Sequence, residues 1–344
     1  MPGSATLCGR RRLLQALLLA PWAWRASAGE VLAGVFGAIP DPARVTRVLT
    51  AGPPAGVLVY CLAPDKLLGW SQPLGPQALA WVAPHMRTLP FLGRLSGRGS
   101  TLSAESLLAL APDLILDAGT VNDTYRSAAR RVQEQTGVPY VLVDGRLADS
   151  AAQLRQVGRL LGVERRGEQL AAHAQAVLDL AQRLASRAAG PRIYFARGRD
   201  GLETGLRGAI HTEVLQAAGG RNVADALGDG GLARVSLEQL LAWDPDMILG
   251  QDAAVLAHIR SDSGWRALRA VREGQVHGAP VLPFGWLDGP PGVNRLLGLH
   301  WLLPLLYPDV GLPTPVAAAR DFFSLFYGFT PEAGALERLL VESA

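Results

Sequence analysis

The stretch SAESLLALAPDLIL, residues 103–116, decides the fold because it returns as SLEQLLAWDPDMIL at residues 236–249. The two copies align without a gap and share Ser, Glu, Leu-Leu-Ala, Pro-Asp and a final apolar run. In each copy the serine suits the N-cap of a short amphipathic helix, and the Pro-Asp pair separates that helix from a buried strand. The repeat therefore predicts one helix–strand unit in each half of the chain, and two similar lobes with a ligand between them.

The segments around the repeat alternate between apolar strands and amphipathic helices. In the first half we expect strands at residues 45–49, 67–68 and 140–143, and helices at about 53–62 and 125–135. Residues 71–100 are rich in Gly, Pro and Ser and indicate an excursion over the surface. In the second half we expect a strand at 192–196 and a helix at 210–218. This alternation predicts parallel sheets covered by helices.

One long helix is predicted between the two halves. Its apolar positions, spaced by three or four residues, are Leu170, Ala174, Val177, Ala181, Leu184 and Ala188. A helix over about residues 164–188 would span roughly 35 Å. We therefore predict an α/β fold with two Rossmann-like lobes joined by a single long α-helix. The expected division is an N-terminal lobe at 29–160, the linking helix at 161–189 and a C-terminal lobe at 190–344.

The first 28 residues have the pattern of an export signal. Arg10, Arg11 and Arg12 precede Leu-Leu-Gln and a short apolar run, and a small-residue cleavage site ends at Ala28. The apolar run is too short for a permanent membrane span. The paired arginines resemble a twin-arginine signal, and an ordinary secretory signal is the alternative. Both predict a periplasmic protein whose signal is cleaved near Ala28.

Composition excludes some classes of function. The chain has 33 basic and 30 acidic residues, and the signal would remove four of the basic ones and none of the acidic ones. The mature chain would therefore be close to neutral, which speaks against a nucleic-acid-binding protein. Removal of the signal also leaves Cys61 as the single cysteine, so neither an internal disulfide nor a cysteine-based metal site is expected.

Several stretches resemble the periplasmic substrate-binding proteins of ABC importers for iron–siderophore, haem and vitamin B12. They are the two repeat copies, the segment 219–224 (GGRNVA) and the segment 290–298 (PPGVNRLLG). The resemblance implies capture of a small-molecule metal chelate between the lobes and delivery to an ABC permease dimer in the inner membrane. Binding of a molybdate or tungstate oxyanion, or of a nickel chelate, is the alternative on the same scaffold.

An enzyme built on the same architecture is the rival from another class. A Rossmann-type enzyme would need Gly-x-Gly-x-x-Gly after a strand, but Gly97-Arg98-Gly99 follows no expected strand and lacks the third glycine. We therefore predict neither a catalytic site nor a resident cofactor. Histidines and carboxylates occur singly rather than in ligand spacing, so no protein-held metal site is predicted either.

Ligands of parallel α/β lobes lie at the carboxyl ends of the strands, so the loops there supply the candidate contacts. A guanidinium group can clamp an anion, and a tryptophan ring can cover a flat ligand. The predicted ligand-binding residues are Trp81, Arg94, Thr120, Asn122, Arg197, Arg207, Trp286 and Asp288. His85 and His211 also lie near the expected cleft.

Glu105 and Glu238 occupy the same position in the two repeat copies. A carboxylate in the first turn of a helix complements the helix dipole, which accounts for either residue alone. The resemblance implies a further role, because in the vitamin B12 binding proteins the matching glutamate of each lobe pairs with arginines of one permease subunit. We therefore predict that Glu105 and Glu238 dock the protein onto its permease.

Overall fold

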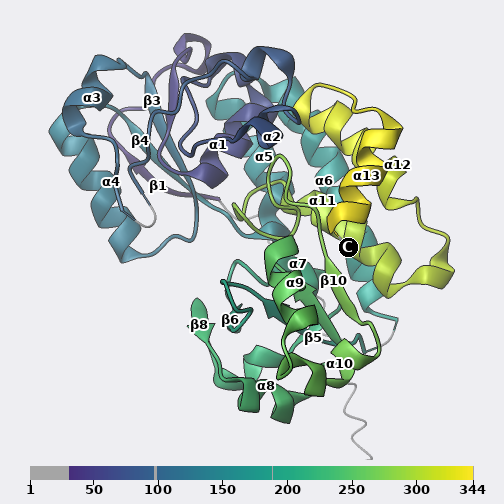
Figure 1. Cartoon of the computed structure of the whole chain (residues 1–344). Helices are drawn as coiled ribbons and strands as arrows, with labels where there is room; N and C mark the ends of the chain where they lie inside the picture. The colour runs from purple at the N-terminus through teal and green to yellow at the C-terminus, as the bar shows by residue number, and fades with distance from the viewer. Residues whose placement is uncertain (1–30, 97–98, 188, 344) are drawn as a thin grey trace, which may run out of the picture.

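A computed structural model describes residues 31–96, 99–187 and 189–343, and it contains two α/β lobes connected by one long helix (Figure 1). The predicted fold class is therefore confirmed. The predicted export signal, residues 1–28, lies outside the described residues.

The N-terminal lobe is built on a four-stranded sheet in the order β1-β4-β3-β2. Strands β2, β3 and β4 are parallel, and β1 is antiparallel to β4. Strand β1 was not predicted, and the expected strand at 67–68 is reduced to a single bridge between Leu67 and Val48. The strands are β1 (Leu32–Phe36), β2 (Val48–Thr50), β3 (Leu114–Gly119) and β4 (Tyr140–Asp144). The helices are α1 (Pro53–Leu62), α2 (Pro76–Leu79), α3 (Ala104–Ala109), α4 (Asp123–Thr136) and α5 (Ser150–Leu160).

The C-terminal lobe has a parallel sheet in the order β10-β9-β5-β7 and a separate antiparallel pair, β6 and β8. The strands are β5 (Arg192–Ala196), β6 (Glu203–Gly205), β7 (Arg221–Asn222), β8 (Leu232–Arg234), β9 (Met247–Gly250) and β10 (Val276–Gly278). The helices are α7 (Glu213–Ala217), α8 (Leu237–Trp243), α9 (Ala253–Ser261), α10 (Arg269–Arg272) and α11 (Arg295–Leu306).

The two copies of the sequence repeat adopt the same local structure. Ser103 and Ser236 are the N-caps of α3 and α8, and each hydroxyl accepts a hydrogen bond from the amide three residues later, at 3.1 and 3.2 Å. Ala111 and Asp244 follow these helices at equivalent positions, with φ of 43° and 40°. Within the described residues, they are the only non-glycine residues with positive φ. The lobes therefore share backbone geometry as well as sequence.

Each lobe also ties its repeat to the preceding strand in the same way. The Asp113 carboxylate accepts a hydrogen bond from the Arg47 amide at 2.9 Å, and the Asp246 carboxylate accepts one from the Arg192 amide at 2.7 Å. The side chains of Arg47 and Arg192 donate to carbonyl oxygens at the ends of α3 and α8. These donors satisfy carbonyl groups that a helix leaves unpaired at its C-terminus. The aspartate of each Pro-Asp pair thus fixes the strand that precedes it in the sheet.

The linking helix α6 spans Glu164–Ala185, so it ends slightly earlier than predicted. The predicted apolar stripe is buried at Leu170, Ala174, Val177, Ala181 and Leu184. Its 22 residues give a rod of roughly 33 Å. In the described part of the chain no helix, α6 included, combines the length and apolar character needed to cross a membrane.

The end of the chain leaves the second lobe and packs beside α6 (Figure 1). It forms α12 (Pro315–Phe322), a π-helical turn (Phe323–Tyr327) and α13 (Ala333–Ser343). The Tyr60 hydroxyl on α1 donates to the Tyr327 carbonyl at 2.7 Å, and Arg166 on α6 donates to the Leu325 carbonyl. The division at 29–160, 161–189 and 190–344 remains a prediction, to which the structure adds this return of the C-terminal tail.

Candidate ligand-binding site

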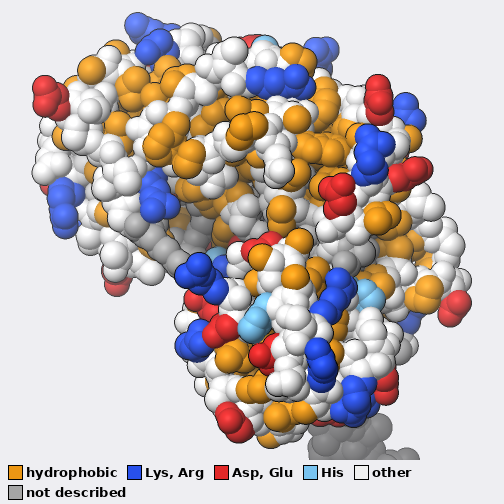
Figure 2. Space-filling view, in the orientation of Figure 1, with side chains coloured by type: hydrophobic (Ala, Val, Ile, Leu, Met, Phe, Trp, Pro, Cys, Tyr) orange, Lys and Arg blue, Asp and Glu red, His pale blue; other side chains and the backbone are white. Residues whose placement is uncertain are grey.

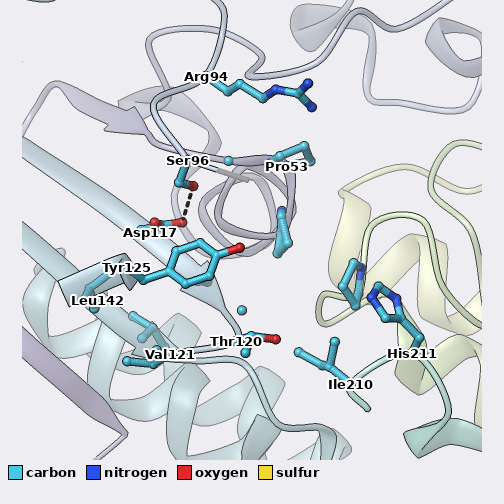
Figure 3. Close-up of a pocket in the computed structure, with 16 residues that line it drawn as sticks. Pro53, Arg94, Ser96, Asp117, Thr120, Val121, Tyr125, Leu142, Ile210 and His211 are labelled. Carbon is cyan, nitrogen blue, oxygen red and sulfur yellow. Dashed lines mark hydrogen bonds between the residues drawn. The ribbon is translucent and has the colours of Figure 1, made fainter. Parts of the chain in front are cut away.

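A cavity of about 160 Å³ lies where the two lobes face each other, at the indentation visible in Figure 2. Residues from both lobes line it (Figure 3). The N-terminal lobe contributes Gly52, Pro53, Pro54, Arg94, Ser96, Asp117, Ala118, Gly119, Thr120, Val121, Tyr125, Leu142 and Val143, and the C-terminal side contributes Ile210, His211 and Pro291.

The carboxyl ends of β2, β3 and β4 place the N-terminal lining residues, as expected for ligand sites of parallel sheets. Gly119 ends β3 with φ of 139°, a conformation that side-chain-bearing residues rarely adopt. Gly145 approaches it so closely that a Cβ atom at Gly145 would lie 2.6 Å from the Gly119 Cα. Two glycines therefore allow the ends of β3 and β4 to meet under the cavity.

The start of α1 presents little hydrogen-bonding capacity to the cavity. Pro53 and Pro54 are its first two residues and line the cavity, and proline has no amide hydrogen. The usual attraction of a helix N-terminus for an anion is therefore weakened here. Polar recognition must come from side chains and from the Gly119–Val121 loop instead.

Asp117 is a buried carboxyl group in the cavity wall, 4% exposed. Its Oδ1 accepts a hydrogen bond from the Ser96 hydroxyl at 3.0 Å (Figure 3), and its Oδ2 accepts one from the Tyr140 hydroxyl at 3.0 Å. Burial raises the pKa of the Asp117 carboxyl to about 6, although both hydrogen bonds act in the opposite direction. The carboxyl can therefore change its charge near neutral pH.

Arg94 and Tyr125 complete the polar part of the N-terminal wall. Arg94 extends over Pro53 at the rim, and its Nε donates to the Gly99 carbonyl at 3.1 Å. The Tyr125 hydroxyl points into the space between Asp117 and the opposite lobe (Figure 3). Together with Thr120, these side chains offer one permanent positive charge and two hydroxyl groups.

On the opposite wall, His211 is held by a charged cluster behind it. Its Nδ1 lies 2.9 Å from the Asp288 Oδ2, and Arg197 forms an ion pair with the same carboxylate. The Asp288 side chain is only 2% exposed, and Arg197 also lies 3.6 Å from Glu203. Asp288 and Arg197 thus orient His211 from behind rather than line the cavity.

Of the eight predicted ligand-binding residues, two line the cavity and six do not. Arg94 and Thr120 line the cavity. Asn122 is the N-cap of α4, and its side chain accepts from the Tyr125 amide at 3.2 Å. Arg197 and Asp288 lie behind His211, as described above.

The last three predicted residues also lie outside the cavity lining, and each pairs with a different part of the chain. The Arg207 side chain is 58% exposed and lies 3.7 Å from Asp229. Trp286 is 1% exposed, and its indole nitrogen donates to the Leu282 carbonyl at 3.1 Å. Trp81 packs edge-on against Phe323 of the C-terminal tail, with ring centroids 5.7 Å apart.

Sequence reasoning did not select Ser96, Asp117 or Tyr125 for the site. The available signal for Asp117 was an acidic residue within an apolar strand, close to its carboxyl end. His211 was placed near the cleft, but its orientation by Asp288 depends on residues 77 positions apart. Within residues 31–96, 99–187 and 189–343, no group of three or more His, Cys, Asp or Glu side chains is arranged to hold a metal ion.

The fold and the interlobe cavity define a solute-binding protein, and comparison with known proteins agrees. A model of the periplasmic binding protein family matches residues 94–281, more than half of the chain, and the chain belongs to this family. Members of the family bind solutes outside the cytoplasm for an ABC transporter permease and are not enzymes. The protein is therefore the extracytoplasmic solute-binding component of an ABC transporter.

Three relatives illustrate the similarity. The molybdate-binding protein MolA of Haemophilus influenzae is 28% identical over 291 residues, which cover 76% of this chain and 78% of MolA. The Fe(3+) dicitrate-binding periplasmic protein FecB of Escherichia coli is 26% identical over 181 residues, 51% of this chain and 58% of FecB. An ABC transporter solute-binding protein from Sulfurospirillum deleyianum superposes with a TM-score of 0.80 at 27% identity, covering 88% of this chain and 95% of that protein.

Proposed function

We propose that this protein captures a small metal oxyanion of the molybdate or tungstate kind for its importer. The size of the cavity carries this proposal: about 160 Å³ is close to the roughly 150 Å³ that holds a single benzene molecule. Pockets for drug-sized ligands measure about 300–1,000 Å³. Haem, corrinoid and iron–siderophore ligands, which the sequence alone ranks first, would have to remain largely outside the cavity.

The polar groups of the cavity are suited to an oxyanion. Arg94 carries a permanent charge and donates in a fork, and Thr120 and Tyr125 add hydroxyl donors. His211 adds a further donor from the opposite lobe when its cavity-facing nitrogen carries a proton. Similarity to the molybdate-binding protein MolA supports the same ligand class.

Asp117 fits an oxyanion only in its neutral form, because an ionised carboxylate in the wall would repel the ligand. When Asp117 is protonated, its O–H can donate a hydrogen bond to the Ser96 hydroxyl oxygen. The Ser96 O–H is then free to donate a hydrogen bond to the ligand. A bound anion would favour this protonated state. The proposal therefore predicts that binding takes up a proton, so affinity should fall as the pH rises through about 6.

A ferric chelate is the second candidate, favoured by the similarity to the Fe(3+) dicitrate-binding protein FecB. A chelate of this kind can sit at the rim near Arg94 with only one arm in the cavity. If the ligand presents a metal cation to Asp117, the ionised carboxylate is preferred. Affinity would then rise with pH, opposite to the oxyanion case.

Calorimetric titration of purified protein with molybdate, tungstate, sulfate and ferric citrate tests the proposal. Replacing Arg94 with Ala should weaken molybdate binding by about tenfold to a hundredfold, the cost of one charge-assisted hydrogen bond. Arg207→Ala is the matched control, since Arg207 is exposed and paired with Asp229, and it should bind as the parent does. If the protein binds ferric citrate but neither molybdate nor tungstate, the oxyanion proposal is wrong and the ferric chelate is the ligand class.

We also propose that Glu105 and Glu238 dock the loaded protein onto the permease. Both are exposed in the first turn of their repeat helix, α3 and α8. Three residues further on, each helix exposes a leucine at the equivalent position: Leu108 is 50% and Leu241 is 37% exposed. Residues three apart lie on the same helix face, so each lobe presents an acidic and an apolar contact together. Two equivalent patches suit a permease made of two equivalent subunits.

A further inference from the structure

Arg295, at the start of α11, is a charged side chain buried at the junction of the lobes, 1% exposed. Its ionic partner is Glu213 at the start of α7, with 2.6 Å between Arg295 Nη1 and Glu213 Oε2. Burial of a guanidinium is costly unless its donors are satisfied. The other hydrogen-bond partners of Arg295 and Glu213 therefore indicate which parts of the molecule this buried pair holds together.

The pair holds the N-terminal lobe by its backbone. Arg295 Nη2 donates to the Gly145 carbonyl at 2.5 Å, and the Leu147 amide donates to Glu213 Oε2 at 2.7 Å. Arg295 thus donates to a carbonyl, and Glu213 accepts from an amide, of the same short loop that follows β4. Both contacts cross from the C-terminal side of the molecule to the first lobe.

The same guanidinium group reaches three segments that form the cavity. Its Nη1 donates to the carbonyl of Ile210, a lining residue, at 2.7 Å, and its Nε donates to the Gly292 carbonyl, one residue after lining Pro291, at 3.1 Å. The Gly145 amide in turn donates to the carbonyl of lining Gly119 at 2.8 Å. One side chain therefore fixes both walls of the cavity without touching its interior.

We propose that Arg295 and Glu213 form an interlobe clamp that holds the cavity walls at a preset separation before ligand arrives. Arg295 is then a positioning residue for ligand binding. If loss of the clamp leaves about one molecule in ten with the walls in place, the apparent Kd rises about tenfold. This effect on affinity rests on the proposed oxyanion ligand, whereas the preset separation can be measured without any ligand.

The test compares interlobe distances in ligand-free protein by pulsed electron paramagnetic resonance. Spin labels are attached to Glu134→Cys on α4 and Arg272→Cys on α10, both exposed, while fully buried Cys61 stays unlabelled. The parent should give one narrow distance distribution, and Arg295→Met should broaden it or add a second population. Arg155→Met is the control, because Arg155 pairs with Glu168 between α5 and α6 without reaching the C-terminal lobe.

Glu213→Ala is a second clamp variant for the same distance measurement, and because Glu213 is partly exposed the proposal remains testable if Arg295→Met does not fold. This variant should broaden the distribution of interlobe distances and weaken molybdate binding about tenfold. A narrow, unchanged distribution in a folded clamp variant overturns the proposal, and so does unchanged molybdate affinity despite broadened distances. If the parent protein binds no molybdate, the proposed ligand fails and the distance measurement alone decides the clamp.

Discussion

The imidazole of His211 is hydrogen-bonded to the carboxylate of Asp288, with 2.9 Å between Nδ1 and Oδ2, and only His211 of the two lines the cavity. Which nitrogen of a neutral histidine carries the proton depends on the partner of the other nitrogen. The buried carboxylate therefore orients the imidazole and accepts from Nδ1–H, so His211 donates to an anion in the cavity when both of its ring nitrogens carry a proton.

Replacement of Asp288 by Asn should weaken oxyanion binding through His211. Calorimetric titration should show a loss for Asp288→Asn and a similar loss for His211→Ala. The double variant should bind no more weakly than His211→Ala alone, because both changes remove the same contact. If the losses of the two single variants add up in the double variant, Asp288 contributes to binding independently of His211.

Asp117 should make binding depend on pH. The pKa of its carboxyl is about 6 in the folded protein, and a neighbouring anion favours the protonated form. Molybdate affinity should therefore be highest below about pH 6 and fall by up to about tenfold per pH unit above it. Asp117→Asn should flatten this profile, whereas Asp123→Asn, an exposed carboxylate near the same loop, should leave it unchanged.

The opposite slope would contradict an anionic ligand. Affinity that increases as the pH rises through about 6 indicates that the ligand prefers an ionised Asp117, as a metal cation would. The same titration with ferric citrate then becomes the decisive comparison.

Changing both Glu105 and Glu238 to Ala should abolish uptake while ligand affinity and melting temperature remain near those of the parent. Uptake is measured in cells that rely on this importer, and docking is measured with permease in lipid nanodiscs. Docking of the parent should weaken with salt, since exposed charges are screened beyond ~10 Å at ~0.1 M ionic strength. Glu134→Ala with Glu337→Ala removes the same charge from other exposed helices and should have no effect.

Export should depend on the paired arginines before the apolar run. Changing Arg10 and Arg11 to Lys preserves the charge, so a general secretory signal would tolerate it, whereas a twin-arginine signal would not. Fractionation should find precursor of the double variant in the cytoplasm, and protein starting near residue 29 in the periplasm for the parent. Arg25→Lys, near the cleavage site, is the control and should be exported.

The sequence predicted those parts of the fold that local patterns encode. The repeat copies, the stripe from Leu170 to Leu184 and the two-lobed class are all confirmed. Strand β1 was missed because its short run contains Gly34 and its pairing partner β4 lies about a hundred residues away. Pairing between strands that far apart in the sequence produces no pattern of apolar residues within β1 itself.

The cavity was harder to predict because side-chain direction depends on distant contacts. Thr120 was predicted from its place in the loop after a strand and Arg94 from the glycine-rich excursion at 71–100, and both line the cavity. Trp286 was expected in the cleft because Gly and Asp flank it, yet its ring is buried and its indole nitrogen is bonded within its own loop. Asp117 was overlooked because the surrounding strand is apolar, and its hydroxyl partners come from separate segments.

The return of the C-terminal tail has a consequence for biosynthesis. Tyr327 stacks on Tyr60 and contacts Phe284 edge-on, so the last part of the chain completes a cluster that the first helix begins. A ribosome must therefore release nearly the whole polypeptide before the lobe that was synthesised first can close its interior. A premature stop codon shortly before residue 322 should accordingly leave Tyr60 and the interior of the N-terminal lobe without part of their packing.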